Sequence, residues 1–535
     1  MTQISESHTP QVASRRYAFL VAAGILLSRI AGLVRDRVFA HYFGDSFAAD
    51  AFRAAFRIPN ALQNLFGEGV LSASFIPVYA GLLARDDDEE ARRAAGATAA
   101  ILGLTISLLV LAGVLATPYL IAFIAPGFHG ETRALTIRLV RILFPGAGLL
   151  VFSAWCLGIL NSHRRFFLSY TAPVIWNAAM IATMLKYGGL NAPPSLAVIL
   201  AWGSVVGSGL QVLIQLPTVL RLLRGLRLSL GRRSDNVRIV VKNFLPVFIG
   251  RGVVQISAYV DVWLASLVPI VGAVAGLSYA QTLYTLPVSL FGMSVSAAEL
   301  PQMSGAVGSE AQIAEILRGR LNGGLRQIAF LVVPSAAAFL ILGDVVVGAI
   351  YRTGLFTQAE VFYVWGILAG ATVGLLASTL GRLYASTYYA LRDTRTPLWF
   401  AIIRVALTTA LGYLCALPLP RYLGIDPRWG VAGLTISAGI ASWIEFHLLR
   451  RALNRRIGAT GLPIEYLAKV WTMALVGAAV GWEIHRRWWH LAPIPMAVAV
   501  LLPYGAIYFG GTWLAGIAES RALFSRFLAR MRTVS

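Results

Sequence analysis

The segment "LFGEGVLSASFIP", residues 65–77, returns in altered form as "LFGMSVSAAELP", residues 290–301. A second pair recurs at nearly the same distance, "LGILNSHRRFFLSYTAP" at 157–173 and "LGRLYASTYYALRDTRTP" at 380–397. The offsets between matched positions run from 381 − 158 = 223 to 290 − 65 = 225 residues. Their agreement indicates an internal duplication, which decides how the rest of the chain is divided.

Composition identifies the solvent in which the duplicated parts fold. Of the 535 residues, 57% are hydrophobic and 13% are charged. A soluble protein of this size could not bury so much apolar surface, so the chain must lie in a bilayer. Apolar runs of roughly 20 residues recur throughout, and they predict an all-α polytopic membrane protein. Fourteen helices are expected, at 17–42, 50–84, 92–124, 133–160, 168–187, 194–222, 239–267, 270–303, 322–346, 359–390, 396–418, 429–452, 464–484 and 491–516.

The repeat spans six of these helices, an even number, so both copies have the same orientation in the membrane. Parallel repeats of this kind are typical of transporters whose substrate lies between two bundles. The predicted segments are an N-terminal tail (1–16), an N-lobe of helices 1–6 (17–222), a basic linker (223–238), a C-lobe of helices 7–12 (239–452), a final helix pair (464–516) and a basic tail (517–535).

The formal net charge of +21 first suggests a nucleic-acid partner, but the positions of the charges oppose it. Basic residues gather in alternate loops, for example 85–93, 221–242 and 450–456, and in both tails. This is the positive-inside bias of membrane proteins, and it predicts that both termini lie on the cytoplasmic side of the membrane. Attraction to anionic membrane lipids explains the basic excess without a nucleic acid.

Several classes of function lack their motifs. The two cysteines, Cys156 and Cys415, fall in predicted helices and cannot form a disulfide framework. The seven histidines have no metal-ligand spacing, so no metal site is expected. No phosphate-binding G-x-x-x-x-G-K-[ST] loop occurs, and the chain is not expected to be an enzyme or to need a cofactor.

Charged residues inside the first two predicted helices are the strongest functional signal. Arg29 lies 12 residues after Tyr17, at a depth where a charge costs ~2.5–3.5 kcal/mol and must face protein or water. Helical periodicity places Ser28, Arg29, Arg35 and Asp36 on one arc of helix 17–42. Asp50, Arg53, Arg57, Asn64 and Glu68 share an arc of helix 50–84, while helix 239–267 adds Arg251, Gln255 and Asp261.

These arginines outnumber the carboxylates that could neutralise them. Pairing of Arg35 or Arg57 with Asp36, Asp50 or Glu68 is the structural alternative, although it cannot account for every guanidinium. An anionic substrate is the best partner for the excess, and phosphate fits the planar fork of arginine.

Helix 270–303 carries polar but uncharged residues at its centre. Gln281, Thr282 and Thr285 belong to a stripe that could line the same cavity and contact sugar or peptide groups. Hydrogen bonding between packed helices explains the hydroxyls equally well.

The motifs "LSRIAGLVRD" (27–36), "FGDSFAADAFRAAFRIPN" (43–60) and "LFGEGVLSASFIPVY" (65–79) closely resemble the MurJ family of lipid II flippases. This family belongs to the multidrug/oligosaccharidyl-lipid/polysaccharide exporter superfamily. The resemblance implies two lobes around a cationic cavity, with a groove beside helices 464–484 and 491–516 for the lipid tail. It also implies that alternating access carries lipid II, an undecaprenyl-diphosphate-linked disaccharide-pentapeptide, to the outer leaflet. Arg29, Arg35 and Asp50 match positions associated with function in the family.

Two departures from the family pattern leave alternatives open. Gln63 stands where the family commonly has arginine, and Gln281, Thr282 and Thr285 replace a D-R-x-x-E motif. The alternatives are a flippase for another polyprenyl-linked saccharide, a cation-coupled drug antiporter and a non-transporting scaffold for envelope synthesis. We expect Arg251 to supply the missing base, and snorkelling of Arg251 to the cytoplasmic surface is the competing interpretation.

The resemblance and the missing nucleotide-binding motif also predict the energy source of transport and the binding partners. Without a nucleotide loop, transport would be driven by an ion gradient, the membrane potential or consumption of the product. Asp261 is the candidate cation ligand of the second lobe. The expected partners are lipid II, membrane lipids and the peptidoglycan synthesis machinery.

Overall fold

The computed structural model describes residues 10–67, 71, 74–226, 228–229 and 235–532, without the side chains of 10–22, 235, 243, 245–258 and 526–532. Regular structure in these ranges is helical, apart from one β-bridge between Thr353 and Phe356. Contacts divide the chain into a first unit, Met1–Ser266, and a second unit, Leu267–Ser535, which are described separately.

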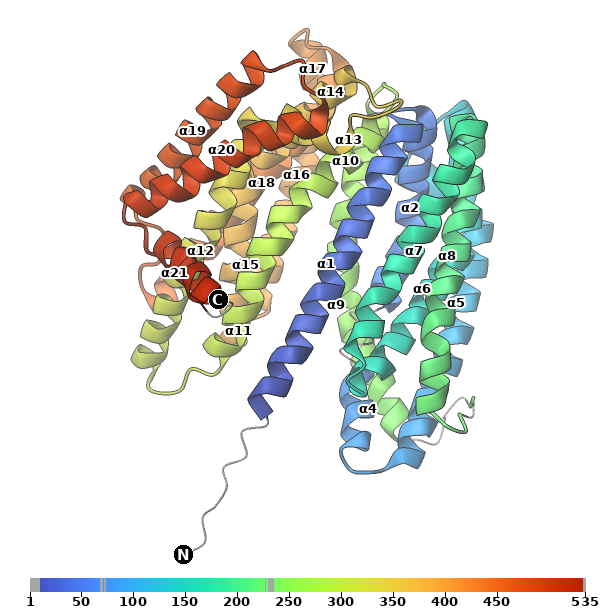
Figure 1. Ribbon diagram of the computed structural model, residues 1–535. Helices are drawn as coiled ribbons and strands as arrows, with labels where there is room; N and C mark the ends of the chain where they lie inside the picture. The colour runs from blue at the N-terminus through green and yellow to red at the C-terminus, as the bar shows by residue number, and fades with distance from the viewer. Residues whose placement is uncertain (1–9, 68–70, 72–73, 227, 230–234, 533–535) are drawn as a thin grey trace, which may run out of the picture. The chain divides into compact units, whose positions relative to one another are not determined.

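The first unit is a helical bundle in which α6 is central (Figure 1). Helix α6 packs on α2, α5 and α8, while α7 packs on α1 and α8. The elements are α1 (Pro10–Phe43), α2 (Phe47–Phe66), α4 (Ile76–Leu83), α5 (Asp88–Ile124), α6 (Gly130–Ser162), α7 (Phe166–Tyr187), the 3₁₀ turn η1 (Gly188–Leu190), α8 (Pro193–Leu222) and α9 (Asp235–Leu267).

The second unit repeats these pairings with its own elements. Helix α18 packs on α14, α15 and α16, as α8 does on α6 and α7, and α12 packs on α15 and α19. The elements are α10 (Ala273–Pro287), the π-helix η2 (Val288–Met293), α11 (Ser294–Ser304), α12 (Glu310–Ile341), α13 (Gly343–Tyr351), α14 (Gln358–Thr372), α15 (Leu375–Ala390), α16 (Arg395–Ala416), α17 (Pro418–Tyr422), η3 (Pro427–Trp429), α18 (Gly430–Ile457), α19 (Ile464–Arg487), α20 (Pro493–Leu514) and α21 (Ala518–Arg532).

The duplication is visible in two matching turns. After α6, Arg164 adopts a left-handed conformation (φ 59°) and Arg165 N–H donates to the Leu160 carbonyl at 2.8 Å. After α15, Arg392 adopts φ 60° and Asp393 N–H donates to the Tyr388 carbonyl at 2.9 Å. The turns lie 392 − 164 = 228 residues apart, which is more than the offset of 223 to 225 residues between the repeated motifs. The difference arises because α15 continues past Gly381 for about one helical turn more than α6 continues past the matching Gly158.

Several expected helix boundaries are wrong. The expected helix 50–84 is not a single helix, since α2 ends at Phe66 and α4 spans Ile76–Leu83, and helix 359–390 is bent by 41° between α14 and α15. The "P-x-x-x-F-G" segment of helix 270–303 forms the π-helix η2, a form that local sequence patterns do not predict. Helix 322–346 begins earlier, at Glu310, because Ser309 and Gln312 form a reciprocal capping box.

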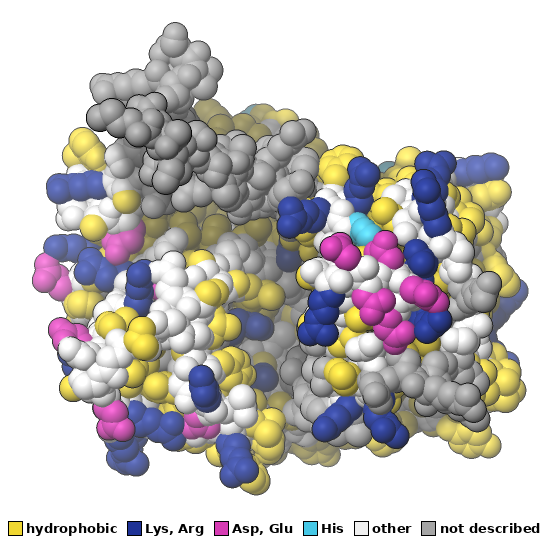
Figure 2. Space-filling view, turned by 90° about the horizontal axis from the view of Figure 1, so that it is seen from below, with side chains coloured by type: hydrophobic (Ala, Val, Ile, Leu, Met, Phe, Trp, Pro, Cys, Tyr) yellow, Lys and Arg dark blue, Asp and Glu magenta, His cyan; other side chains and the backbone are white. Residues whose placement is uncertain are grey.

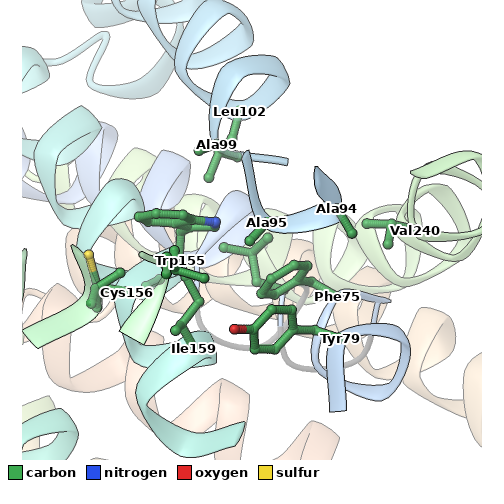
Figure 3. Packing of buried hydrophobic residues seen from close by; sticks show 14 of the residues in the cluster. Phe75, Tyr79, Ala94, Ala95, Ala99, Leu102, Trp155, Cys156, Ile159 and Val240 are labelled. Carbon is green, nitrogen blue, oxygen red and sulfur yellow. The ribbon is translucent and has the colours of Figure 1, made fainter. Parts of the chain in front are cut away.

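A cluster of buried side chains holds α4, α5, α6 and α9 together in the first unit (Figure 3). Phe75 and Tyr79 stack with ring centroids 5.2 Å apart, and Ala94 and Ala95 leave room for the aromatic rings. Cys156 is buried in the same cluster, and both cysteines are free, as the sequence predicted.

Ten helices in the described part of the chain are long and apolar enough to cross a membrane, or eleven if the bent α14–α15 pair counts as one. The expected number of fourteen is therefore not confirmed. Helix α2 shows why apolarity alone misses some segments, because Asp50, Arg53 and Arg57 fall within its 20 residues.

The end of the first unit that contains α4 is strongly charged. Figure 2 shows acidic side chains there among Lys and Arg side chains. The turn between α4 and α5 accounts for them, since Asp86 to Glu89 are exposed and Arg93 pairs with Glu89 and Glu90. The sequence "RDDDEEARR" at 85–93 therefore forms an exposed turn of mixed charge and the start of α5.

Helix α9 contacts several other elements of the first unit. Asn236 donates to Glu90, Phe244 packs against Phe66 with ring centroids 5.5 Å apart, and Ser266 accepts from Gly127 N–H. The sequence assigned this helix to the C-lobe, and those lobe boundaries stay a prediction.

Candidate functional site

Three charged side chains of α1 and α2 meet inside the first unit. Arg35 donates to Asp36 Oδ1 from Nε at 3.3 Å and from Nη2 at 3.0 Å. Arg53 donates to the same oxygen from Nη1 at 3.2 Å. The side chain of Asp36 is 5% exposed, against 17% for Arg35 and 14% for Arg53. One buried carboxylate therefore serves two guanidinium groups, and we call these three residues the Asp36 cluster.

Aromatic and amide groups complete the surroundings of the cluster. The Arg35 guanidinium lies 5.2 Å from the Trp176 ring centroid, and Arg53 lies 4.4 Å from that of Phe39. Asn177 Oδ1 accepts from Arg35 Nη1 at 3.1 Å, while its amide nitrogen donates to the Pro173 carbonyl. These cation–π and amide contacts fix the planes of both guanidinium groups.

Trp176, Asn177 and Phe39 are not among the residues that the sequence predicted for the site. The sequence could have indicated Asn177, because it is the single amide side chain within the apolar segment "PVIWNAAMIAT" (173–183) of α7. Trp176 and Phe39 had no such signal, since aromatic residues are common throughout these helices.

Local capping positions α2 and its arginines. Ser46 is the N-cap and accepts from Ala49 N–H at 3.3 Å, and Asp50 N–H donates to the Ser46 carbonyl. Asp50 is 4% exposed and lies in the first turn, where the helix dipole favours a negative charge. This contribution to helix stability is a structural role for Asp50, beside the functional role implied by the family motif.

Arg57 lies further along α2 and faces α9. Its carbonyl accepts from the Tyr259 hydroxyl at 3.5 Å, and its guanidinium is within electrostatic range of Asp261. Asp261, the candidate cation ligand, therefore already has a basic neighbour, which a bound cation would have to tolerate.

Among the other predicted residues of the first unit that the structure describes, two are exposed. Arg29 is exposed on α1, next to the half-buried Ser28 and between the exposed Leu27 and Ile30, and Asn64 is exposed near the end of α2. Glu68 and the side chains of Arg251 and Gln255 lie outside the described residues, so their roles stay predictions.

Two hydroxyls of the polar stripe of α10 donate to carbonyls of their own helix. Thr282 Oγ1 donates to the Ser278 carbonyl at 3.0 Å, and Thr285 Oγ1 donates to the Gln281 carbonyl at 2.7 Å. Back-bonding of this kind satisfies the hydroxyl without a partner helix. It is a third account of the stripe, beside cavity lining and interhelical hydrogen bonding.

The second unit has an ion pair between two membrane-spanning helices that the sequence analysis did not find. Arg404 Nε of α16 lies 3.0 Å from Glu445 Oε2 of α18, with side-chain exposures of 31% and 20%. Nearby, the hydroxyls of Tyr284 and Ser378 lie 2.8 Å apart. The sequence offered Arg404 with no carboxylate in its own helix, and the partner comes from the next predicted helix.

Comparison with known proteins places the chain in a family. The family model described as "Lipid II flippase MurJ" matches residues 39–499. The chain belongs to the lipid II flippase MurJ family. The lipid II flippase MurJ of Burkholderia cenocepacia is 30% identical over 516 residues, covering 93% of this chain and 97% of that protein. The probable lipid II flippase MurJ of Rhizobium meliloti is 30% identical, covering 93% and 91%.

Solved structures agree with the MurJ assignment. The structure of a lipid II flippase MurJ in an inward closed conformation superposes with a TM-score of 0.73 at 25% identity, covering 92% of this chain and 99% of that one. An inward-facing multidrug transporter of the MATE family superposes with a TM-score of 0.66 at 19% identity, which shows a shared fold alone. Family membership and the apolar helices together indicate a multi-pass protein of the bacterial inner membrane.

Proposed function

We propose that this chain is a lipid II flippase that carries its substrate from the cytoplasmic to the outer leaflet by alternating access. We further propose that the Asp36 cluster binds the diphosphate of that substrate, with Arg29, Asp50 and Arg57 contributing to the same binding region. Family membership supports the first statement. The shared carboxylate of Asp36 supports the second.

The charge ratio of the Asp36 cluster favours an anion. Arg35 and Arg53 together carry two positive charges and Asp36 carries one negative charge, so the cluster keeps a net charge of about +1 in a poorly solvated site. Guanidinium groups bind phosphate oxygens with charge-assisted hydrogen bonds that are about twice as strong as neutral ones. Because Asp36 uses a single oxygen for both arginines, an incoming phosphate can replace one of these bonds without leaving a guanidinium unpaired.

A leaflet-accessibility assay tests the proposal. Full-length protein in liposomes with labelled lipid II should expose the label at the outer surface without added nucleotide. Arg35→Gln should abolish this activity, and Arg35→Lys should reduce it, because lysine keeps the charge but loses the fork. Arg421→Gln, which removes an exposed arginine of α17, is the matched control and should transport normally. Normal transport by Arg35→Gln would refute the diphosphate site, and no transport by the unaltered protein would refute the flippase.

The orientation and energy source belong to the same proposal. The basic loops support cytoplasmic termini, which proteolysis of inside-out vesicles would test at the Arg-rich segment 521–532. Membrane potential is a sufficient source of energy, since one charge crossing 100 mV gains ~2.3 kcal/mol. Strict dependence of transport on ATP would contradict it. Recruitment of the peptidoglycan synthesis machinery would be tested by affinity purification of the intact protein from membranes.

A further inference from the structure

The second unit contains a pocket of about 420 Å³ that the proposed flippase mechanism does not use. It is enclosed by α13, α14 and the hairpin between α19 and α20. Its polar lining consists of Asp344, Arg352, Gln358, His485 and His490, and Trp489 lies at the same site. Val345 and Met496, on the apolar side, belong to the core that joins α13 to α20.

In this pocket the acidic side chain has a partner, while the strongest base has none in the described part of the chain. Asp344 Oδ2 lies 3.4 Å from His485 Nδ1, so its carboxylate already has a partner. Arg352 is exposed, and its guanidinium has no carboxylate or hydrogen-bond partner within the part of the chain that the structure describes. His490 is likewise exposed. An available guanidinium beside two imidazoles favours an oxyanion, and the planar fork of arginine favours phosphate.

The position of the pocket along the membrane-spanning helices indicates where that phosphate comes from. The pocket lies where α19 ends at Arg487 and α20 begins at Pro493, and both helices are apolar enough to cross the membrane. Three tryptophans at this end are largely exposed: Trp482 (52%), Trp488 (51%) and Trp489 (75%). Tryptophan is enriched where the membrane meets water, at the level of the lipid headgroups. The pocket therefore opens at the depth of the lipid phosphates.

We propose that this pocket binds the phosphate of a membrane phospholipid, with Arg352 as its main ligand. His490 and Gln358 donate to the remaining phosphate oxygens, and Trp489 packs against the glycerol end of the lipid. The bound headgroup links α13 and α14 to the α19–α20 hairpin. This site uses none of the residues of the Asp36 cluster and does not depend on the proposed transport mechanism.

Lipid retention by the full-length protein tests the proposal. The purified protein is titrated with phosphatidylglycerol in detergent, and native mass spectrometry follows the bound lipid. Arg352→Gln should weaken the tightest binding step about tenfold, which corresponds to ~1.4 kcal/mol. Arg421→Gln removes an exposed arginine of α17 outside the pocket and should bind as the unaltered protein does. Since Arg352 is exposed and without a partner, its replacement should leave the melting temperature unchanged.

Further measurements with other ligands decide whether the bound phosphate belongs to a lipid. If both variants bind phosphatidylglycerol equally, the site does not exist as proposed. If inorganic phosphate raises the melting temperature through Arg352 while phosphatidylglycerol does not bind there, the ligand is free phosphate and the lipid assignment is wrong. If maltose, which has no phosphate, binds in an Arg352-dependent way, the pocket recognises saccharide and the phosphate chemistry is wrong. Weaker lipid binding by Trp489→Ala as well as by Arg352→Gln would support the whole pocket.

Discussion

The two units treat charge inside the membrane differently. In the first, Arg35 and Arg53 share the single buried carboxylate of Asp36. In the second, Glu445 forms an ion pair with Arg404, and the exposed Arg382 lies within electrostatic range of the same carboxylate. Both units therefore place a carboxylate near two arginines. They differ in bonding and burial, since the buried Asp36 binds both of its arginines directly, whereas the more exposed Glu445 has one guanidinium at ion-pair distance.

The difference suggests a division of labour between the repeats. A carboxylate that binds two guanidinium groups can give up one of them to a phosphate, while a single directly bonded pair mainly joins two helices. This interpretation predicts larger functional effects at the Asp36 cluster than at the Arg404–Glu445 pair.

The largest effect is expected from Asp36→Asn. Removing the shared carboxylate leaves two buried guanidinium groups without their common partner, which should cost about 3 kcal/mol of folding free energy and abolish transport. Glu445→Gln is the counterpart and should cost about 1 kcal/mol, because its pair is more exposed. Thermal unfolding and the leaflet assay measure both quantities. Equal loss of transport in the two variants would remove the proposed difference between the units.

Arg53→Lys should have the next largest effect. Lysine keeps the charge but cannot both contact Asp36 and stack on Phe39 as the planar guanidinium does. We expect transport to fall about tenfold, with a loss of about 1 kcal/mol in stability. Arg404→Lys should remain within about twofold of normal transport, because a single carboxylate can accept an ammonium group equally well. Normal transport by Arg53→Lys would show that positive charge alone is sufficient.

A double-mutant cycle at Arg404 and Glu445 measures how much their ion pair contributes to the stability of the second unit. The single alanine variants should each destabilise the protein, and the double variant should lose about 1 kcal/mol less than their sum. If the pair only joins α16 to α18, the double variant should still transport lipid. Complete loss of transport in a stably folded double variant would place this pair in the transport mechanism.

The smallest effect is expected at the matching turns. Asp393 accepts from the backbone N–H groups of Arg395 and Thr396 at 3.0 Å. The bond from Thr396 N–H, together with the nearby Arg456, lowers the pKa of the Asp393 carboxyl to about 2. In the equivalent turn of the first unit, the N-cap residue of α7, Arg165, forms no side-chain capping bond. Asp393→Ala should therefore cost about 1 kcal/mol at neutral pH.

The pH dependence of that loss has a definite sign. Because the folded pKa lies below the unfolded value of about 3.9, the stabilisation is complete above that value and disappears as pH falls through about 2. Unfolding of the unaltered and Asp393→Ala proteins should converge over this interval. A constant difference down to pH 2 would assign the effect to something other than the carboxylate. Arg456→Ala should have a smaller effect, since the Thr396 backbone bond is the main cause of the shift.

Much of the architecture followed from local sequence properties. Apolar length predicts membrane helices because each backbone group must be hydrogen-bonded within its own segment in lipid. The cost of charge in the membrane singled out Arg35, Arg53 and Asp36 before their contacts were known. The repeated motifs predicted the duplication, although not the extra turn of α15, since motif spacing does not show where a helix ends.

The tertiary structure alone decided how these charges are paired. Asp36 meets Arg53 from 17 residues away, and Arg35 meets Asn177 from 142 residues away. Glu445 reaches Arg404 from a different helix. Periodicity gives the direction of a side chain around its own helix axis, but a hydrogen bond forms only when two helices bring donor and acceptor within about 3 Å. The sequence therefore determined which charged groups the membrane-spanning helices carry. Helix packing determined which of them share a carboxylate, namely Arg35 and Arg53 at Asp36 in the first unit and Arg404 at Glu445 in the second.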